Sequence, residues 1–196
     1  MPKPYTPNDK WSKRAAAEGY RARSVYKLME LDERFHLFSD GMKVLDLGAA
    51  PGSWLQYASA AVGPRGKVLG LDLTEIKPVK DNVRTAMIDV TDLRKIEIFF
   101  KEQKIDRVNL VLSDMAPLTS GIHDIDQWRS VELAEAACAV ALQFLKPGGF
   151  CVIKIFRGVD FDPFLVKVRT MFSLVKIVTV EATRDRSREV YLVMKK

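Results

Sequence analysis

The stretch Lys43-Val44-Leu45-Asp46-Leu47-Gly48-Ala49-Ala50-Pro51-Gly52-Ser53-Trp54, KVLDLGAAPGSW, decides the fold. Residues 43–47 have the apolar pattern of a buried strand, and the small residues that follow form a turn into a helix predicted near 53–62. A strand that passes through a tight turn into a helix is the opening unit of an open α/β sheet. Ligands bind outside the carboxyl ends of the strands in such sheets, so this turn is the expected binding site.

The same alternation of elements continues along the chain. Strand patterns recur with room for a helix between them, at 43–47, 68–73, 85–88, 108–113 and 150–156. Helical patterns occur at 24–37 and near 53–62, 92–103, 127–146 and 161–172. Near-continuous apolar strands are typical of a parallel sheet with helices on both faces. Two last strand-like runs, 174–181 and 189–194, are joined by a loop too short for a crossover, which predicts an antiparallel pair.

Length and composition indicate one domain that spans residues 1–196, because 196 residues with 47% hydrophobic content can bury one core. Cys138 and Cys151 lie in apolar surroundings, which favours a reducing compartment. No run approaches the roughly 18 apolar residues of a membrane span, and the N-terminus lacks a signal-peptide pattern. We expect a cytoplasmic monomer with no membrane partner and no metal, while a mitochondrial or nuclear eukaryotic relative stays possible.

The net charge of +6 is unevenly distributed. Residues 1–27 hold seven Lys or Arg against two acids, and 164–196 hold eight against three. The middle, 28–163, holds sixteen against twenty. Basic ends, including an N-terminal segment at about 1–23, indicate either a polyanionic partner or a simple aid to solubility.

Acidic residues follow four successive predicted strands. They are Asp46, Asp72, Asp89 and Asp114. The turn lacks both the dinucleotide pattern G-x-G-x-x-G and the Gly-Lys-Ser/Thr of a phosphate loop, which argues against a dehydrogenase. Carboxylates at this edge suit a cationic ligand with a free ribose and an amino group, such as S-adenosylmethionine. Each Asp alone is more often a helix cap or turn residue.

A second signal is Lys154, which lies in the middle of the strand-like run CVIKIF at 151–156. Burying an unpaired ammonium group lowers folding stability by roughly several kcal/mol. Lys154 is therefore expected either to extend to solvent at the strand end, to pair with a carboxylate, or to serve in chemistry.

Four motifs, DLGAAPGSW, SDMAP, CVIKIF and RSREVYLV, together resemble the FtsJ/RrmJ family of S-adenosylmethionine-dependent ribose 2'-O-methyltransferases. The resemblance runs from GYRARSVYKL almost to the C-terminus. It implies a Rossmann-like methyltransferase fold, a mostly parallel seven-stranded sheet with an antiparallel C-terminal strand. One departure is Ser53, where family members often have a second glycine, and we expect this serine to cap the following helix.

The resemblance also implies site residues. The catalytic positions fall on Lys27, Asp114, Lys154 and Glu189. The cofactor-binding positions fall on Gly48, Gly52, Trp54, Asp72, Asp89 and Asp114. A ribose hydroxyl is a weak nucleophile, so Lys154 would either accept its proton or orient its oxygen, and the sequence leaves both roles open.

The implied substrate is RNA, with a uridine of large-subunit ribosomal RNA as the expected target. Transfer RNA is an alternative, and a non-catalytic RNA-binding ribosome assembly factor is an alternative of another class. Basic residues of the two ends are expected to contact phosphates, and aromatic residues among them to stack on bases or to pack internally. These are Lys10, Lys13, Arg14, Arg21, Arg23, Arg184, Arg186 and Arg188, with Trp11, Tyr20 and Tyr26.

Overall fold

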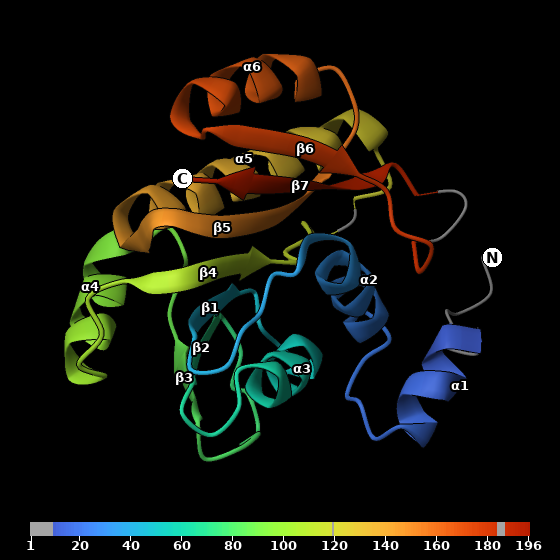
Figure 1. Cartoon of the computed structure of the whole chain (residues 1–196). Coiled ribbons are helices and arrows are strands. Elements are labelled where there is room, and N and C mark those ends of the chain that lie inside the picture. Colours follow the sequence, from blue (N-terminus) through green and yellow to red (C-terminus); the bar gives the residue numbers. More distant parts are fainter. Residues whose placement is uncertain (1–9, 119, 184–186) are drawn as a thin grey trace.

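The computed structural model describes residues 10–118, 120–183 and 187–196. At its centre is a seven-stranded sheet with the strand order β3-β2-β1-β4-β5-β7-β6 (Figure 1). β1 to β5 pair in parallel, and β7 is antiparallel to both β5 and β6. The strands are β1 Lys43–Leu47, β2 Lys67–Asp72, β3 Val83–Met87, β4 Val108–Ser113, β5 Leu145–Phe156, β6 Leu174–Val178 and β7 Glu189–Lys195. The predicted α/β fold with an antiparallel C-terminal strand is confirmed.

Helices cover both faces of the sheet. They are α1 Lys10–Ala17, α2 Val25–Phe35, α3 Ser53–Ala61, α4 Leu93–Glu102, α5 His123–Phe144 and α6 Phe161–Met171. One buried cluster joins the strands to α4, α5 and α6, and a second joins them to α2 and α3. Figure 1 shows α2 and α3 together on one side of the sheet.

Strand alternation decides which side chains face α2 and α3. On β5, Cys151, Ile153 and Ile155 belong to the cluster under α4, α5 and α6, while Val152 belongs to the cluster under α2 and α3. Successive side chains of a strand point to opposite faces, so Lys154 lies on the same face as Val152. The lysine within CVIKIF is thus directed toward α2.

Some predicted boundaries differ from the structure. The sequence pattern misses α1, a short helix whose only buried residue is Ala15. The helix predicted near 127–146 begins earlier, at His123, and ends at Phe144. The predicted turn before residue 150 lies within β5, where Gly148 has φ +76° and the pairing with β4 shifts register between Val108 and Leu110. An irregular start lets this strand include turn residues.

The ends of the parallel strands define two opposite sides of the sheet, which we call the carboxyl edge and the amino edge. Asp72 ends β2, and the loops that follow the carboxyl ends of β1, β3 and β4 contain Gly48, Asp89 and Asp114; the amino ends lie at the opposite edge. Within the described part of the chain, no helix has the length and apolar character needed to cross a membrane.

Candidate active site

Four charged side chains meet at the carboxyl edge of the sheet. Lys154 Nζ lies 3.1 Å from Asp114 Oδ1 and 3.9 Å from Glu189 Oε2. The same nitrogen donates to the backbone carbonyl of Asp114 at 2.5 Å. Lys27 Nζ donates to Glu189 Oε1 at 2.5 Å. The structure therefore brings together Lys27, Asp114, Lys154 and Glu189, which we call the charged cluster.

Separate elements supply each member of the charged cluster. Lys154 comes from β5, and Glu189 begins β7, where it pairs in register with Phe156. Asp114 follows the last residue of β4, and Lys27 lies in the first turn of α2. Figure 1 shows α2 beside the carboxyl end of β4, which is the position that brings Lys27 within reach.

Burial makes the pairing of these charges necessary. Lys27, Lys154 and Glu189 are 8%, 6% and 8% exposed. Isolated charges at such positions are strongly destabilising, whereas two ammonium groups between two carboxylates compensate one another. Burial raises the pKa of Asp114, but the charges of Lys154 and Lys27 more than offset it, so this pKa lies below its ordinary value. Asp114 is a carboxylate at neutral pH.

Tyr191 joins the cluster, although the sequence analysis gives it no role. Its hydroxyl donates to Asp114 Oδ1 at 2.6 Å, and its side chain is fully buried. Burial raises the pKa of Tyr191 well above its ordinary value, and the charges of Asp114 and Glu189 raise it further. Tyr191 thus remains a hydrogen-bond donor. Its position two residues after Glu189, on the same strand face, is the signal that could have identified it.

The glycine turn after β1 needs backbone conformations that favour glycine. Gly48 has φ +72°, and a Cβ there would lie 2.4 Å from Met115 Cγ. Gly52 has φ +106°, and a Cβ there would lie 2.8 Å from Arg21 Nη1. Asp72 Oδ2 accepts the amide of Ala50 at 2.9 Å, which ties this turn to the end of β2. Larger residues would displace the turn.

A small pocket of about 50 Å³ opens between this turn and the charged cluster. Its lining includes Ser24, Asp46, Gly48 and Asp114. Asp46 Oδ2 is buried and has no hydrogen-bond partner among the described residues. Burial raises the pKa of Asp46 well above its ordinary value, and the nearby charges of Asp114 and Asp72 add to this effect. An unpaired buried acceptor suits a ligand that brings a donor or positive charge.

One prediction for the turn is wrong. Ser53 does not cap α3, because Gly52 occupies the N-cap and no side chain caps it; Ser53 Oγ instead lies 3.1 Å from Ser24 Oγ. Trp54 also lines the small pocket but is 3% exposed, and its indole nitrogen donates to Ser24 O at 2.8 Å. This bond fastens α3 to the start of α2, and the role of Trp54 in cofactor binding stays a prediction.

Asp72 and Asp89 stabilise turns as well as lying at strand ends. Asp72 Oδ1 accepts the amide and hydroxyl of Thr74 at 2.9 and 2.8 Å. Asp89 Oδ1 accepts the same pair of groups from Thr91 at 2.9 and 2.7 Å. These backbone and side-chain hydrogen bonds lower the pKa of Asp89. Both carboxylates are therefore fixed in orientation at the carboxyl edge.

Arg21 is half-buried beside the glycine turn. Its guanidinium donates to the carbonyls of Pro51, Lys77 and Pro78 at 3.1, 2.7 and 2.5 Å. It thereby joins the glycine turn to the loop that follows β2. The expectation that Arg21 contacts phosphate stays a prediction.

The aromatic residues of the N-terminal segment pack mainly on one another. The rings of Trp11 and Tyr20 lie 5.1 and 6.5 Å from that of Tyr26, which is 5% exposed. Internal packing, the second of the two expectations for these residues, therefore holds for Tyr26. Lys10, Lys13 and Arg14 are exposed on α1, as is Arg188 before β7. Arg184 and Arg186 lie outside the described residues.

A family model described as FtsJ-like methyltransferase matches residues 20–196, which include the whole charged cluster and the glycine turn. The chain belongs to the FtsJ-like methyltransferase family.

Relatives of this FtsJ-like chain share nearly its full length. One from Bdellovibrio bacteriovorus is 42% identical over 96% of both chains, and one from Myxococcus xanthus is 45% identical over 98% of this chain and 91% of its own. Both are named Ribosomal RNA large subunit methyltransferase E.

Solved structures agree with the fold. A Plasmodium falciparum protein described as a ribosomal RNA methyltransferase is 28% identical, with a TM-score of 0.78 over 90% of this chain and 97% of its own. A Clostridium thermocellum protein, 17% identical with a TM-score of 0.58, shares the fold over 88% of this chain and 96% of its own.

Proposed function

We propose that this chain is an S-adenosylmethionine-dependent methyltransferase that modifies a ribose 2'-hydroxyl of large-subunit ribosomal RNA, with a uridine as target. The observation that carries the proposal is the buried charged cluster beside a pocket with an unpaired carboxylate oxygen. The names of the relatives support ribosomal RNA over transfer RNA and over a non-catalytic role. The uridine rests on the resemblance of the motifs. Residues 1–196 would act as one methyltransferase domain.

The carboxyl edge fits a cationic methyl donor. S-adenosylmethionine, when bound, supplies an electrophilic methyl group on a positively charged sulfur. The unpaired Asp46 Oδ2 offers a buried acceptor for its positive groups, and the glycine turn offers close backbone approach. The residues that would hold the donor are Gly48, Gly52, Trp54, Asp72, Asp89 and Asp114, to which the pocket adds Asp46.

Lys154 would act on the acceptor ribose. Its Nζ is held by Asp114 and faces Glu189, so its position is fixed before RNA binds. A preset amine at the 2'-hydroxyl would orient the oxygen for attack; only in its neutral form could it also accept the departing proton, and as an ammonium it would leave that proton to solvent. Lys27 would act through Glu189, whose carboxylate it shares with Lys154.

RNA would approach the carboxyl edge over basic residues of both chain ends. Lys10, Lys13 and Arg14 on α1 and Arg188 before β7 are exposed there. Lysine and arginine contacts to phosphate depend on salt and not on base sequence. They would hold RNA while the cluster selects the reacting ribose.

The test is transfer of a tritiated methyl group from S-adenosylmethionine to large-subunit ribosomal RNA, followed by complete alkaline hydrolysis. Methylation of a 2'-hydroxyl blocks cleavage of the next phosphodiester, so we expect the label in alkali-resistant dinucleotides that begin with methylated uridine. Label in mononucleotides would indicate base methylation and contradict the proposal. Stronger labelling of transfer RNA would contradict the assignment of substrate.

A further inference from the structure

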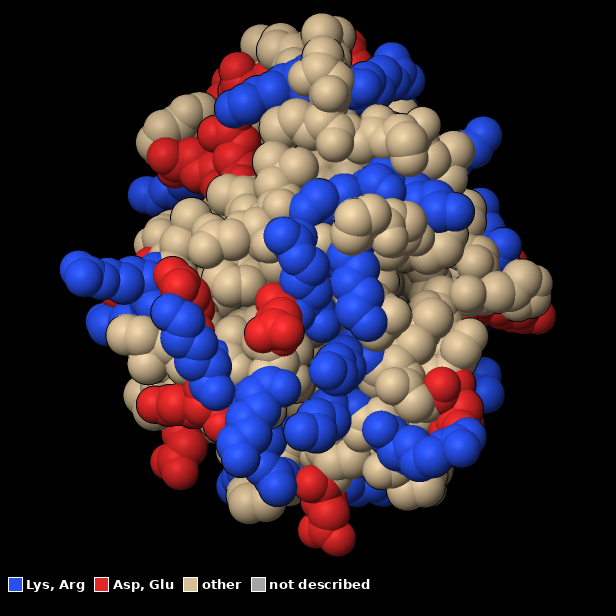
Figure 2. Space-filling model, turned by 60° about the vertical axis from the view of Figure 1, so that its left-hand side comes forward, with Lys and Arg blue, Asp and Glu red and all other residues tan. Residues whose placement is uncertain are grey.

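The edge of the sheet opposite the candidate active site carries its own row of basic side chains. Lys43 and Lys67 begin β1 and β2, Arg84 lies in β3, and Arg107 precedes β4. Lys80 and Lys104 lie in the loops before β3 and after α4. We call these six residues the amino-end band. Figure 2, in which the left-hand side of Figure 1 faces the reader, shows lysine and arginine gathered in a band down this face.

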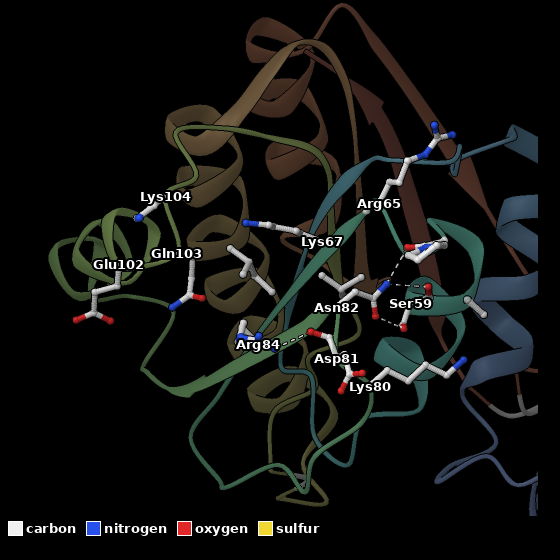
Figure 3. Close-up of a pocket in the computed structure, with 16 residues that line it drawn as sticks. Ser59, Arg65, Lys67, Lys80, Asp81, Asn82, Arg84, Glu102, Gln103 and Lys104 are labelled. Carbon is white, nitrogen blue, oxygen red and sulfur yellow. Dashed lines mark hydrogen bonds between the residues drawn. The ribbon is translucent and has the colours of Figure 1, made fainter.

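A pocket of about 830 Å³ lies within this band (Figure 3). Its walls are the amino ends of β2 and β3, the loops before them, and the end of α4. Lys67, Lys80 and Lys104 line it from three separate segments, and all three are exposed. The space is far larger than the pocket beside Asp46, and it lies at the opposite ends of the strands.

The three pocket lysines have no ion-pair partner within the part of the chain that the structure describes. Asp81 and Glu102 also line the pocket but do not pair with them. By contrast, Lys95, Lys101 and Lys167 on the helices each pair with a carboxylate, at 3.2, 2.7 and 2.7 Å. The pocket lysines are therefore available to an external anion.

Hydrogen bonds fix the walls of this pocket in advance. Asn82 Nδ2 donates to the carbonyls of Ser59 and Gly63 at 3.1 and 2.9 Å, and Ser59 Oγ donates to Asn82 Oδ1 at 2.5 Å. Arg84 Nη1 donates to the carbonyls of Asp81 and Val83, each at 2.8 Å. The close-up in Figure 3 shows the bonds between Asn82 and Ser59, which join the loop before β3 to α3. A fixed wall lowers the entropy lost when a ligand binds.

Like charges are also placed side by side. Lys43 and Lys67 are register partners on adjacent parallel strands, whose backbones lie about 4.8 Å apart. Like charges on neighbouring positions repel each other, so the charges of this pair do not stabilise the fold. A bound anion between them would turn the repulsion into attraction.

We propose that the amino-end band binds backbone phosphates of the substrate RNA, at a second contact remote from the methyl-transfer site. The choice of RNA as the ligand of this band rests on the proposed function, because a ribosomal RNA substrate is a polyanion. β2 has six residues, so the two edges lie about 20 Å apart at roughly 3.3 Å per residue. A different segment of a folded RNA must therefore reach the band. A row that extends over several strands fits a polymer of phosphates better than one compact anion.

The test compares two triple variants with the same loss of charge. One is Lys67→Gln with Lys80→Gln and Lys104→Gln, and the matched control is Lys95→Gln with Lys101→Gln and Lys167→Gln. The affinity of each for full-length large-subunit ribosomal RNA is measured from about 50 to 300 mM salt. The slope of log affinity against log salt is negative, and the loss of three phosphate contacts should make it less steep by about two. Binding should also weaken at least tenfold. The control should bind as the wild type does.

Equal losses in the two triples would show that only net charge matters and would overturn the proposal. An unchanged affinity and slope in the pocket triple would also overturn it and leave a non-RNA anion as the ligand. Binding is measured without methyl transfer, so the outcome is separate from that of the proposed function. A wild-type protein that binds RNA through the band but methylates none would contradict only the proposed function.

Discussion

Lys154 on β5 and Tyr191 on β7 are register partners, and both side chains reach the same oxygen, Asp114 Oδ1. The pairing of two antiparallel strands thus sets the angle between a lysine and a tyrosine at a carboxylate that follows a third strand. Asp114 accepts from both, which leaves it little freedom to rotate. The position of the Lys154 amine is consequently a property of the sheet and not of a flexible side chain.

Tyr191→Phe tests whether this support affects chemistry. Loss of the hydroxyl removes one donor to Asp114 and should cost about 1 kcal/mol of stability, as for a typical hydrogen bond. We expect kcat to fall about tenfold, because Asp114, which holds the Lys154 amine, loses a donor that fixes its orientation, while the affinity for S-adenosylmethionine is unchanged. Tyr57→Phe is the control, since Tyr57 donates to Asp32 outside the cluster at 2.8 Å. If both variants lose kcat equally, Tyr191 has only a structural role.

Lys27 and Glu189 should be strongly coupled. Glu189→Gln leaves Lys27 as a buried ammonium without its carboxylate, which should lower the free energy of unfolding by about 3 to 5 kcal/mol. Adding Lys27→Met should restore part of this loss, because the unpaired charge is removed. Denaturant unfolding of both single variants and the double variant measures the coupling. If the effects of the two single substitutions on the free energy of unfolding add up to that of the double variant, the two side chains do not form a pair in solution.

Arg21→Ala should weaken donor binding without altering the charged cluster. The substitution removes the hydrogen bonds that join the glycine turn to the loop after β2. We expect KM for S-adenosylmethionine to rise about tenfold, equivalent to roughly 1.4 kcal/mol, with kcat nearly unchanged. Arg34→Ala removes a comparable bond to the Thr179 carbonyl far from the turn and should leave KM as it is. A fall in kcat alone would contradict the role of Arg21 in positioning the turn.

Asp46 should make stability depend on pH. Its pKa is raised in the folded chain, so the folded state binds this proton more tightly than the unfolded state does. Stability from this group is therefore fully present below about pH 4, the ordinary range of aspartate, and is lost as pH rises through the folded pKa. Asparagine does not ionise, so Asp46→Asn does not lose stability in this way as the pH rises.

The measurement is unfolding of wild type and Asp46→Asn between pH 4 and 8 without donor. We expect the variant to be more stable at pH 8 by on the order of 1 kcal/mol and to lose this advantage toward pH 4. If the difference in stability between the two proteins stays constant from pH 4 to pH 8, the pKa of Asp46 is not raised in the folded chain.

Much of the fold follows from local sequence, because buried parallel strands are apolar in nearly every residue. The run CVIKIF was predictable as a strand on this ground, and the short loop before Glu189 indicated the antiparallel pair. α1 was missed because a helix with one buried residue leaves little periodic signal. Ser53 was misassigned because the N-cap position depends on the backbone conformation at Gly52.

The convergence of distant side chains was not predictable from periodicity. Lys27 and Glu189 are separated by 162 residues and meet only through the packing of α2 on the sheet. Their presence in one site was expected from the resemblance of the motifs, whereas the signal for Tyr191 is only its position two residues after Glu189 on the same strand face. The amino-end band was also invisible, since it arises within the middle of the chain, where acids outnumber bases. Sheet topology collects these cations at one edge and the aspartates at the other.

The central claim is that Lys154 acts on the reacting ribose, and Lys154→Ala in a single-turnover assay tests it most directly. S-adenosylmethionine affinity is measured by calorimetry on the same preparation, and transfer of labelled methyl to large-subunit ribosomal RNA is followed over time. We predict that donor affinity stays within about twofold of wild type while transfer falls at least a thousandfold, about 4 kcal/mol of lost transition-state stabilisation. Transfer at the wild-type rate by Lys154→Ala would contradict the account.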